Sequence, residues 1–161
     1  SVGTPAVLFE AEQLLRAGAG GACARWFILR LAGLYGPGRH HLLDQVRRGE
    51  AEMAGRGDHF LNLIHRDDVT AAILAAFAAP AGIANEVLNV VDDVPARKAE
   101  VVGWLARELK MPVPSFTGEP VSGRRPESPN RLIANSKIKE LLGWRPAHPD
   151  FRAGYRALLE A

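Results

Sequence analysis

The sequence predicts an α/β fold built on parallel strands. Two short and strongly apolar runs, residues 25–31 and 86–91, alternate with segments whose apolar residues recur every three or four positions. Strands that alternate with helical segments are typical of parallel sheets joined by crossover helices. The composition, 47% hydrophobic and 24% charged over 161 residues, allows a sizeable core and argues against disorder.

The first half of the chain opens with a helical pattern over residues 5–15, which the glycines that follow should end. Residues 25–31 read RWFILRL and are expected to form a largely buried strand that runs into a Gly-Pro-Gly loop. A helix is predicted over residues 41–48. A further strand is predicted over residues 59–64.

A stronger boundary follows at the sequence HRDDVTAAILAAF, where a helix should begin. Asp67 or Asp68 is expected to cap this helix, because a carboxylate there accepts amide hydrogens and complements the helix dipole. His65 and these two acids could also suggest a metal site. Capping is the better interpretation, because no further ligand set with metal spacing appears, and we predict no metal. Pro80 should end the helix.

The second half contains the strand over residues 86–91 and a helix over residues 94–109. A proline-rich stretch then predicts a loop that carries Arg124 and Arg125. Two short helices, residues 136–142 and 151–159, complete the chain. Only two strands are convincing, which is too few, because a parallel sheet must pair its strands and bury both faces.

Four segments carry a family resemblance: ILRLAGLYGPGR, NLIHRDDVTAAI, EVLNVVDDVP and NSKIKELLGWRP, in that order. This order resembles the second half of the extended short-chain dehydrogenase/reductases, the NAD-dependent epimerase/dehydratases. The resemblance implies the C-terminal part of a Rossmann-like, doubly wound parallel sheet plus a small substrate-binding α/β subdomain. Residues 1–161 would be the substrate-binding portion, and the glycine-rich N-terminal Rossmann half would be absent from this chain.

The resemblance also implies a site. Leu31, Ala32, Gly33 and Leu34 would form a wall beside the nicotinamide of NAD or NADP, although an ordinary strand-to-loop turn remains an alternative. Substrate contacts would come from Tyr35, Arg39, His65 and Arg125. The glycines at 18, 20 and 21 do not replace the missing phosphate-binding turn. They follow a helix and precede a strand, and Cys23 stands where a third glycine is needed.

Family members use a Tyr and a Lys, one helical turn apart, for proton transfer. Alignment on Glu10–Glu12 places Thr4 and Leu8 at these positions, and the first 24 residues contain neither Tyr nor Lys. No catalytic residue is therefore assigned. We expect the chain alone to be inactive and to bind no cofactor, and a non-catalytic binding or regulatory module is the alternative.

The expected partners are a small substrate, such as a sugar nucleotide, and the missing Rossmann half. Uncovered strands could also pair two copies in a homodimer. Nucleic acid is not expected, because the net charge is only +2 and the basic residues are interspersed with acids. The chain lacks an apolar run long enough to span a membrane, so a cytoplasmic location is expected.

Overall fold

The computed structural model describes residues 4–18, 25–119 and 130–160, and these residues form an α/β fold. Three ladders are parallel and one is antiparallel among the described strands. The parallel pairs are β1 (Phe27–Leu31) with β6 (Glu86–Val90), β2 (Gly33–Tyr35) with β5 (Leu63–His65), and β3 (Glu52–Met53) with β8 (Ser115–Phe116); the antiparallel pair is β4 (Phe60–Leu61) with β7 (Ala96–Arg97).

Every helix predicted from apolar periodicity is present. The helices are α1 (Thr4–Ala17), α2 (His41–Arg47), α3 (Arg66–Phe77), α4 (Lys98–Glu108), α5 (Ser136–Leu142) and α6 (Phe151–Glu160). The bounds of α5 match the prediction. The first two predicted strands, over residues 25–31 and 86–91, pair with each other as β1 and β6.

Two predicted elements differ from the structure. The strand expected over residues 59–64 is divided into β4 and β5 at Asn62. The Asn62 side chain holds the distant segment 131–133, because Oδ1 accepts from Ile133 N at 2.8 Å and Nδ2 donates to Arg131 O at 3.0 Å. The helix expected over residues 94–109 begins only at Lys98, because the residues before it pair with β4 as β7.

The cap of α3 also differs from the prediction. Neither Asp67 nor Asp68 caps the helix. His65 is the N-cap residue, with extended backbone angles, and its Nδ1 accepts from the Asp67 amide at 3.3 Å. The prediction was wrong because Asp68 is buried, with 1% of its surface exposed, and its carboxylate bonds elsewhere.

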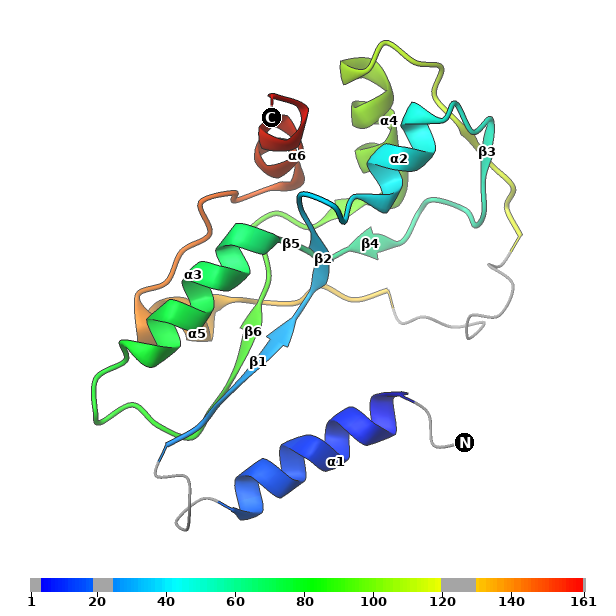
Figure 1. Cartoon of the computed structure of the whole chain (residues 1–161). Helices are drawn as coiled ribbons and strands as arrows, with labels where there is room; N and C mark the ends of the chain where they lie inside the picture. Colours follow the sequence, from blue (N-terminus) through cyan, green and yellow to red (C-terminus); the bar gives the residue numbers. More distant parts are fainter. Residues whose placement is uncertain (1–3, 19–24, 120–129, 161) are drawn as a thin grey trace.

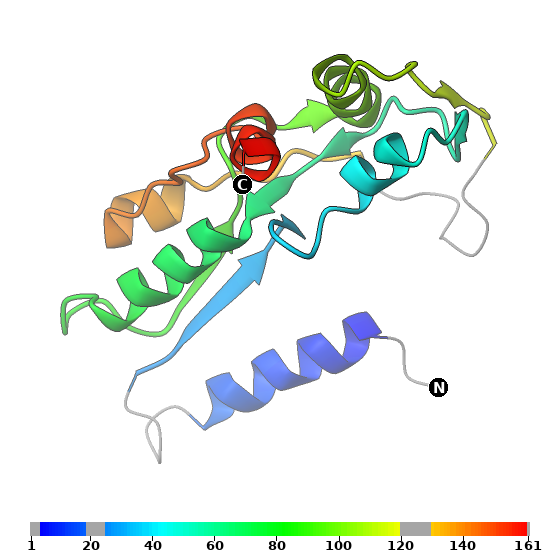
Figure 2. The same cartoon turned by 45° about the horizontal axis from the view of Figure 1, so that its top comes forward.

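Two apolar clusters pack on different parts of the strands. One joins α3 and α5 to β1, β5 and β6 and includes Ile64, Leu88 and Trp144. The other packs α2, α4 and α6 together around Tyr35 and Phe151. Figures 1 and 2 show this division, with α3 and α5 beside β1 and β6, and with α2, α4 and α6 beyond the ends of β2 and β5.

Helix α1 stands apart from both clusters, alongside β1 (Figures 1 and 2). Arg30 of β1 ties it to the strand by donating two hydrogen bonds to the Glu12 carboxylate, at 2.9 and 2.6 Å. Val7, Leu8, Phe9 and Leu14 remain exposed on the helix. This helix is amphipathic, yet within the described chain much of its apolar surface has no cover.

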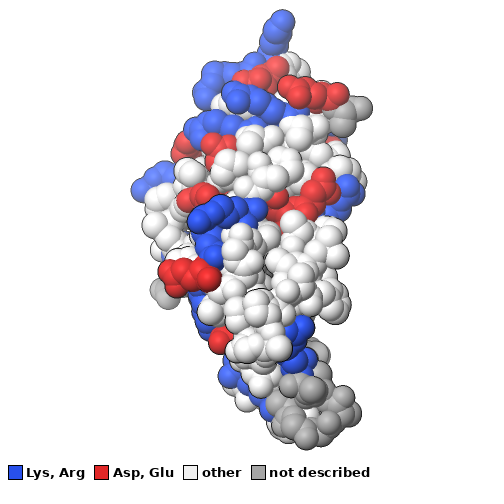
Figure 3. All heavy atoms as spheres, turned by 90° about the vertical axis from the view of Figure 1, so that its left-hand side faces the viewer, with Lys and Arg blue, Asp and Glu red and all other residues white. Residues whose placement is uncertain are grey.

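The far end of α3 is also exposed and apolar. Ile73, Leu74 and Phe77 are exposed there, and the face shown in Figure 3 carries a broad area without charged side chains. Among the described helices, none is both long and apolar enough to cross a membrane.

Candidate functional site

The candidate site lies at the carboxyl ends of the parallel strands, where open α/β sheets usually bind their ligands. The register of the ladder places Tyr35, the last residue of β2, beside His65, the last residue of β5. Their rings meet edge to face with centroids 5.4 Å apart. The structure therefore brings together two of the residues that the sequence assigned to substrate.

The predicted cofactor wall spans the break between β1 and β2. Leu31 is exposed, Ala32 and Leu34 are half-buried, and the Ala32 amide donates to Val90 O at 3.0 Å. Gly33 donates its amide to Asn62 O at 2.8 Å, and a Cβ at this position would lie only 3.0 Å from that oxygen. Gly33 thus suits the close approach of the Asn62 backbone, because a side chain there would have to displace that backbone by a few tenths of an ångström.

The Gly-Pro-Gly loop closes as a tight turn. Gly36 and Arg39 exchange two backbone hydrogen bonds, each of 3.0 Å, and a Cβ on Gly36 would lie 2.8 Å from Arg66 Cβ. Arg39 is exposed, but its guanidinium folds back and donates to Leu34 O at 3.3 Å. The turn therefore holds the Arg39 side chain beside the predicted wall.

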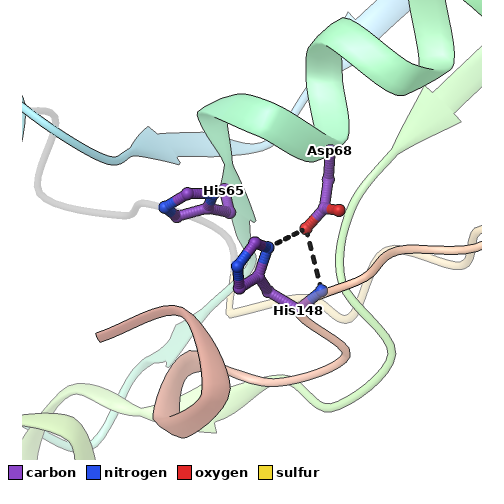
Figure 4. A group of neighbouring side chains, drawn as sticks. All are labelled: His65, Asp68 and His148. Atoms are coloured by element: carbon purple, nitrogen blue, oxygen red, sulfur yellow. Dashed lines mark hydrogen bonds and ion pairs between the residues drawn. The ribbon is translucent and has the colours of Figure 1, made fainter. Parts of the chain in front are cut away.

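A second group of side chains joins α3 to the connection between α5 and α6. Asp68 Oδ1 accepts from the Ala147 amide at 2.7 Å, and Oδ2 accepts from the His148 amide at 3.1 Å. His148 Nδ1 also lies 3.0 Å from Asp68 Oδ2, and the His65 and His148 rings are 4.0 Å apart. Figure 4 shows His148 turned toward Asp68, with His65 beside them.

The donor atoms of His65, Asp68 and His148 lie within 4.8 Å of one another, so these residues could be considered for a metal. Their hydrogen bonds favour a structural role. Both Asp68 oxygens accept backbone amides, and His65 Nδ1 accepts the Asp67 amide. Sequence reasoning noticed His65 and Asp68 but missed His148, because it lies 80 residues away from Asp68 and no local pattern links the two.

Three buried polar atoms at the strand ends lack a hydrogen-bond partner among the described residues: Tyr35 Oη, His65 Nε2 and Asp92 Oδ1. Asp92 follows β6 and is 3% exposed. Burial, followed by the nearby carboxylates of Asp150, Asp93 and Asp68, raises the pKa of Asp92 to about 8. The site therefore holds a carboxyl group that is mostly protonated at neutral pH.

The tyrosines of this region are not activated for proton transfer. Burial raises the pKa of Tyr35 and that of Tyr155 above the usual value, so both phenols keep their protons. Burial, with a smaller effect of His148, lowers the pKa of His65 and favours a neutral imidazole. These groups form a neutral, buried floor beneath the strand ends.

An open groove runs between α1 and β1 and reaches the predicted wall. Leu8, Glu12, Arg30, Leu31 and Arg131 are among its lining residues. Leu8 is the residue aligned with the family Lys, and the groove brings it to the same surface as Leu31. Thr4 begins α1. Arg124, Arg125, Gly20, Gly21 and Cys23 lie outside the described residues.

The fold and the strand-end site can now be compared with known proteins. No profile of a known protein family matches the chain. Structurally, the chain matches NAD-dependent epimerase/dehydratase proteins, the extended short-chain dehydrogenase/reductases, over about half of their chains. The resemblance found in the sequence is thereby confirmed, and the α/β class with parallel strand pairs is confirmed with it.

The solved structures share the fold at low sequence identity. The UDP-glucose 4-epimerase of Thermotoga maritima, solved with UDP-glucose, superposes with a TM-score of 0.74 at 23% identity, over 94% of this chain and 52% of the epimerase. The dTDP-glucose 4,6-dehydratase of Streptomyces venezuelae, solved with NAD, gives 0.75 at 22% identity, over 93% and 47%. RMD of Pseudomonas aeruginosa, solved with NADPH, gives 0.74 at 20% identity, over 94% and 53%.

Two curated relatives are closer in sequence. Protein YeeZ of Escherichia coli is 36% identical over 125 residues, which cover 76% of this chain and 41% of YeeZ. The 3-diazoavenalumate denitrifying reductase of a Streptomyces species is 32% identical over 139 residues, which cover 79% of this chain and 45% of the reductase. The chain therefore spans less than half the length of these curated relatives.

Proposed function

We propose that this chain is the substrate-side half of an NAD(P)-dependent epimerase, dehydratase or reductase, and that it is inactive alone. The observation that carries the proposal is the wall Leu31–Leu34, which lies where parallel strands end and beside an open groove. The fold shared with epimerases and dehydratases supports the proposal, as does the reductase among the relatives.

The residues present fit only one end of the cofactor. The exposed apolar side chain of Leu31 and the bare backbone at Gly33 suit the flat face of a nicotinamide ring. The nicotinamide would supply or accept a hydride. Helix α1 contains neither Tyr nor Lys, so no proton-transfer step is assigned to it. The chain's own residues would position the ring and exclude water from it.

The proposed substrate is a sugar nucleotide or a related small carbonyl or hydroxyl compound. Arg39, exposed at the turn after β2, would be a contact, and Arg125 would be another. Tyr35 and His65 are buried, and we assign them to the floor that supports these contacts. One comparison protein was solved with UDP-glucose, and another is named a 3-diazoavenalumate denitrifying reductase. These two compounds differ, so the comparisons do not narrow the class of substrate.

The proposed partner is the Rossmann half that the relatives' greater length provides. Within the described residues β1 pairs only with β6, so its other edge is free. Apolar grooves flank β1, one formed with α1 and the other with α3, where Phe77 is exposed. A free strand edge between two apolar grooves is a surface that an additional strand and its helices would cover.

Leu8 favours a second candidate function, a non-catalytic binding or regulatory module of the same fold. This residue faces the groove at the position aligned with the family Lys. Leucine can neither hold a charge nor donate a hydrogen bond to a ribose. A protein with this substitution could retain the cofactor without using it for chemistry.

The test compares this chain with the product of its complete open reading frame. Titration with NADH and NADPH, followed by fluorescence, should show binding by the complete protein and none by the chain. Leu31→Gln should weaken that binding about tenfold, since one apolar ring contact is worth about 1.4 kcal/mol. Val113→Gln, an exposed apolar site after α4, is the matched control.

Three results would contradict the proposal. The complete protein could bind the cofactor with an affinity that Leu31→Gln does not change, it could bind neither cofactor, or this chain alone could turn over a substrate. Binding without turnover of any substrate would instead select the regulatory candidate.

A further inference from the structure

We propose that Asn62 is a positioning residue that ties the segment 130–135 to the proposed cofactor wall, so that a displacement at Gly33 reaches Ile133. The inference rests on the proposed function, because Gly33 belongs to the wall assigned to the nicotinamide. It adds a physical link between that wall and the segment that leads into α5. The link consists of hydrogen bonds made by the side chain and the backbone of Asn62.

The segment 130–135 forms neither a helix nor a strand, and asparagine side chains hold it in place. Asn130 Oδ1 accepts from the Phe60 amide at 2.8 Å, and Asn89 Nδ2 donates to Ala134 O at 3.3 Å. In Figures 1 and 2 the segment runs from the region of β4 to the start of α5. Because its backbone groups lack a ladder of their own, its position depends on these side chains.

Asn62 holds this segment as a neighbouring strand would. Its Nδ2 donates to Arg131 O at 3.0 Å, and its Oδ1 accepts from the Ile133 amide at 2.8 Å. A residue in a parallel strand likewise donates to one residue of its neighbour and accepts from the residue two positions further on. The carboxamide can replace a peptide group in this way because it carries both a donor and an acceptor.

The backbone of Asn62 is joined to the wall on its other side. Gly33 donates its amide to Asn62 O at 2.8 Å, and a Cβ on residue 33 would lie 3.0 Å from the same oxygen. Pressure on the wall at Gly33 therefore acts on the Asn62 backbone. The two hydrogen bonds of the side chain restrict its rotation, so a displacement of that backbone moves the segment as well.

The link bears on the substrate, because the segment carries exposed side chains. Arg131 and Leu132 are exposed, and Arg131 lines the same surface as Leu31 of the wall. Asn62 thus sets the position of these side chains relative to the proposed nicotinamide site without touching either ligand.

The first test needs no cofactor and uses the complete protein labelled with ¹⁵N-isoleucine. The Ile133 amide signal is assigned through Ile133→Val. Gly33→Ala should shift this signal, because the added Cβ displaces the Asn62 backbone. The same substitution made in an Asn62→Ala background should leave the Ile133 signal unmoved, since the coupling between two sites is measured by such a double-variant cycle.

Two further backgrounds separate this link from a general loosening of the segment. Asn89→Ala is the matched control. Asn89 holds the same segment from β6, which pairs with β1 and not with β2, so the response of Ile133 to Gly33→Ala should persist. Asn62→Asp keeps the acceptor for the Ile133 amide and should also preserve the response.

Two results of this test would overturn the inference. The Ile133 signal could fail to respond to Gly33→Ala, or the response could survive unchanged in Asn62→Ala. The second result would show that residue 33 reaches the segment by another route.

The second test titrates the complete protein with NADH and NADPH. Binding of either should shift the Ile133 signal in the wild type and in Asn89→Ala, and should leave it unmoved in Asn62→Ala. If neither cofactor binds while the response to Gly33→Ala still passes through Asn62, only the proposed function fails. If a cofactor binds and shifts Ile133 equally in Asn62→Ala, only the link through Asn62 fails.

Discussion

The hydroxyl of Tyr35 rests directly against Gly154 of α6. A Cβ added at residue 154 would overlap the Tyr35 hydroxyl and lie 2.6 Å from Cζ. Both residues are buried, and Tyr155, the next residue of α6, packs its ring 4.7 Å from that of Tyr35. Gly154 therefore lets α6 approach the end of β2, which places the helix beneath the candidate site.

Gly154→Ala should destabilise the protein by about 1–3 kcal/mol, the usual cost of overpacking a core. Chemical denaturation measures this directly. Gly103→Ala is the control, because a Cβ there would meet only the flexible end of Arg107 at 3.6 Å, and alanine favours a helix. Adding Tyr35→Phe to Gly154→Ala should recover part of the loss, and a double variant no more stable than Gly154→Ala would contradict the proposed contact.

Asp92→Asn should stabilise the protein most at alkaline pH. The folded-state pKa of Asp92 is about 8, against an ordinary value of 3.8. Between these values only the unfolded state releases the proton, so the wild type loses stability as pH rises from about 4 to about 8. The asparagine variant lacks this loss.

Melting temperatures of the wild type and Asp92→Asn should nearly coincide at pH 4. They should differ by at least about 5 °C at pH 8. A difference that does not depend on pH would show that Asp92 is ionised in the folded protein throughout this range.

The sequence predicted the local elements well and the distant contacts poorly. Helix start and stop signals located α5 at its observed bounds, because such signals lie within a few neighbouring residues. The break at Asn62 depends on bonds to residues 131–133, and the start of α4 depends on pairing with β4. Such contacts leave no periodic trace in either segment.

In the candidate site, too, local features were predicted and contacts between distant residues were missed. The Gly-Pro-Gly loop was predicted to follow the strand over residues 25–31 directly, but β2 lies between them. The resemblance drew attention to His65, which lies beside the end of β2. The link between Asp68 and His148 was missed because it spans 80 residues. The fit of Tyr35 against Gly154 was missed as well, since a glycine within a helix gives no indication of what it faces.

Asp68→Ala should destabilise the protein by about 3 kcal/mol or more. Removal of the carboxylate leaves the amides of Ala147 and His148 without their acceptor, and each buried unsatisfied donor costs about 1–3 kcal/mol. Asp67→Ala is the control, because Asp67 is exposed and, among the described residues, forms ion pairs with exposed Arg66 and weakly with His65. Equal losses from the two variants would contradict the structural role of Asp68.

Glu12→Gln should loosen α1 from β1 without unfolding the rest of the chain. Arg30, the first cause of the lowered Glu12 pKa, binds this carboxylate, and the pair is the main polar link between α1 and the strand. Hydrogen exchange should show faster exchange of the α1 amides in the variant and unchanged exchange in α4. High salt should have a similar effect on the wild type, because the pair is exposed to solvent and its attraction is screened.

Glu10→Gln is the control, because Glu10 is exposed on the same helix, and it should leave the exchange of the α1 amides unchanged. Equal acceleration by the two glutamine variants would show that α1 is held by something other than the Glu12–Arg30 pair.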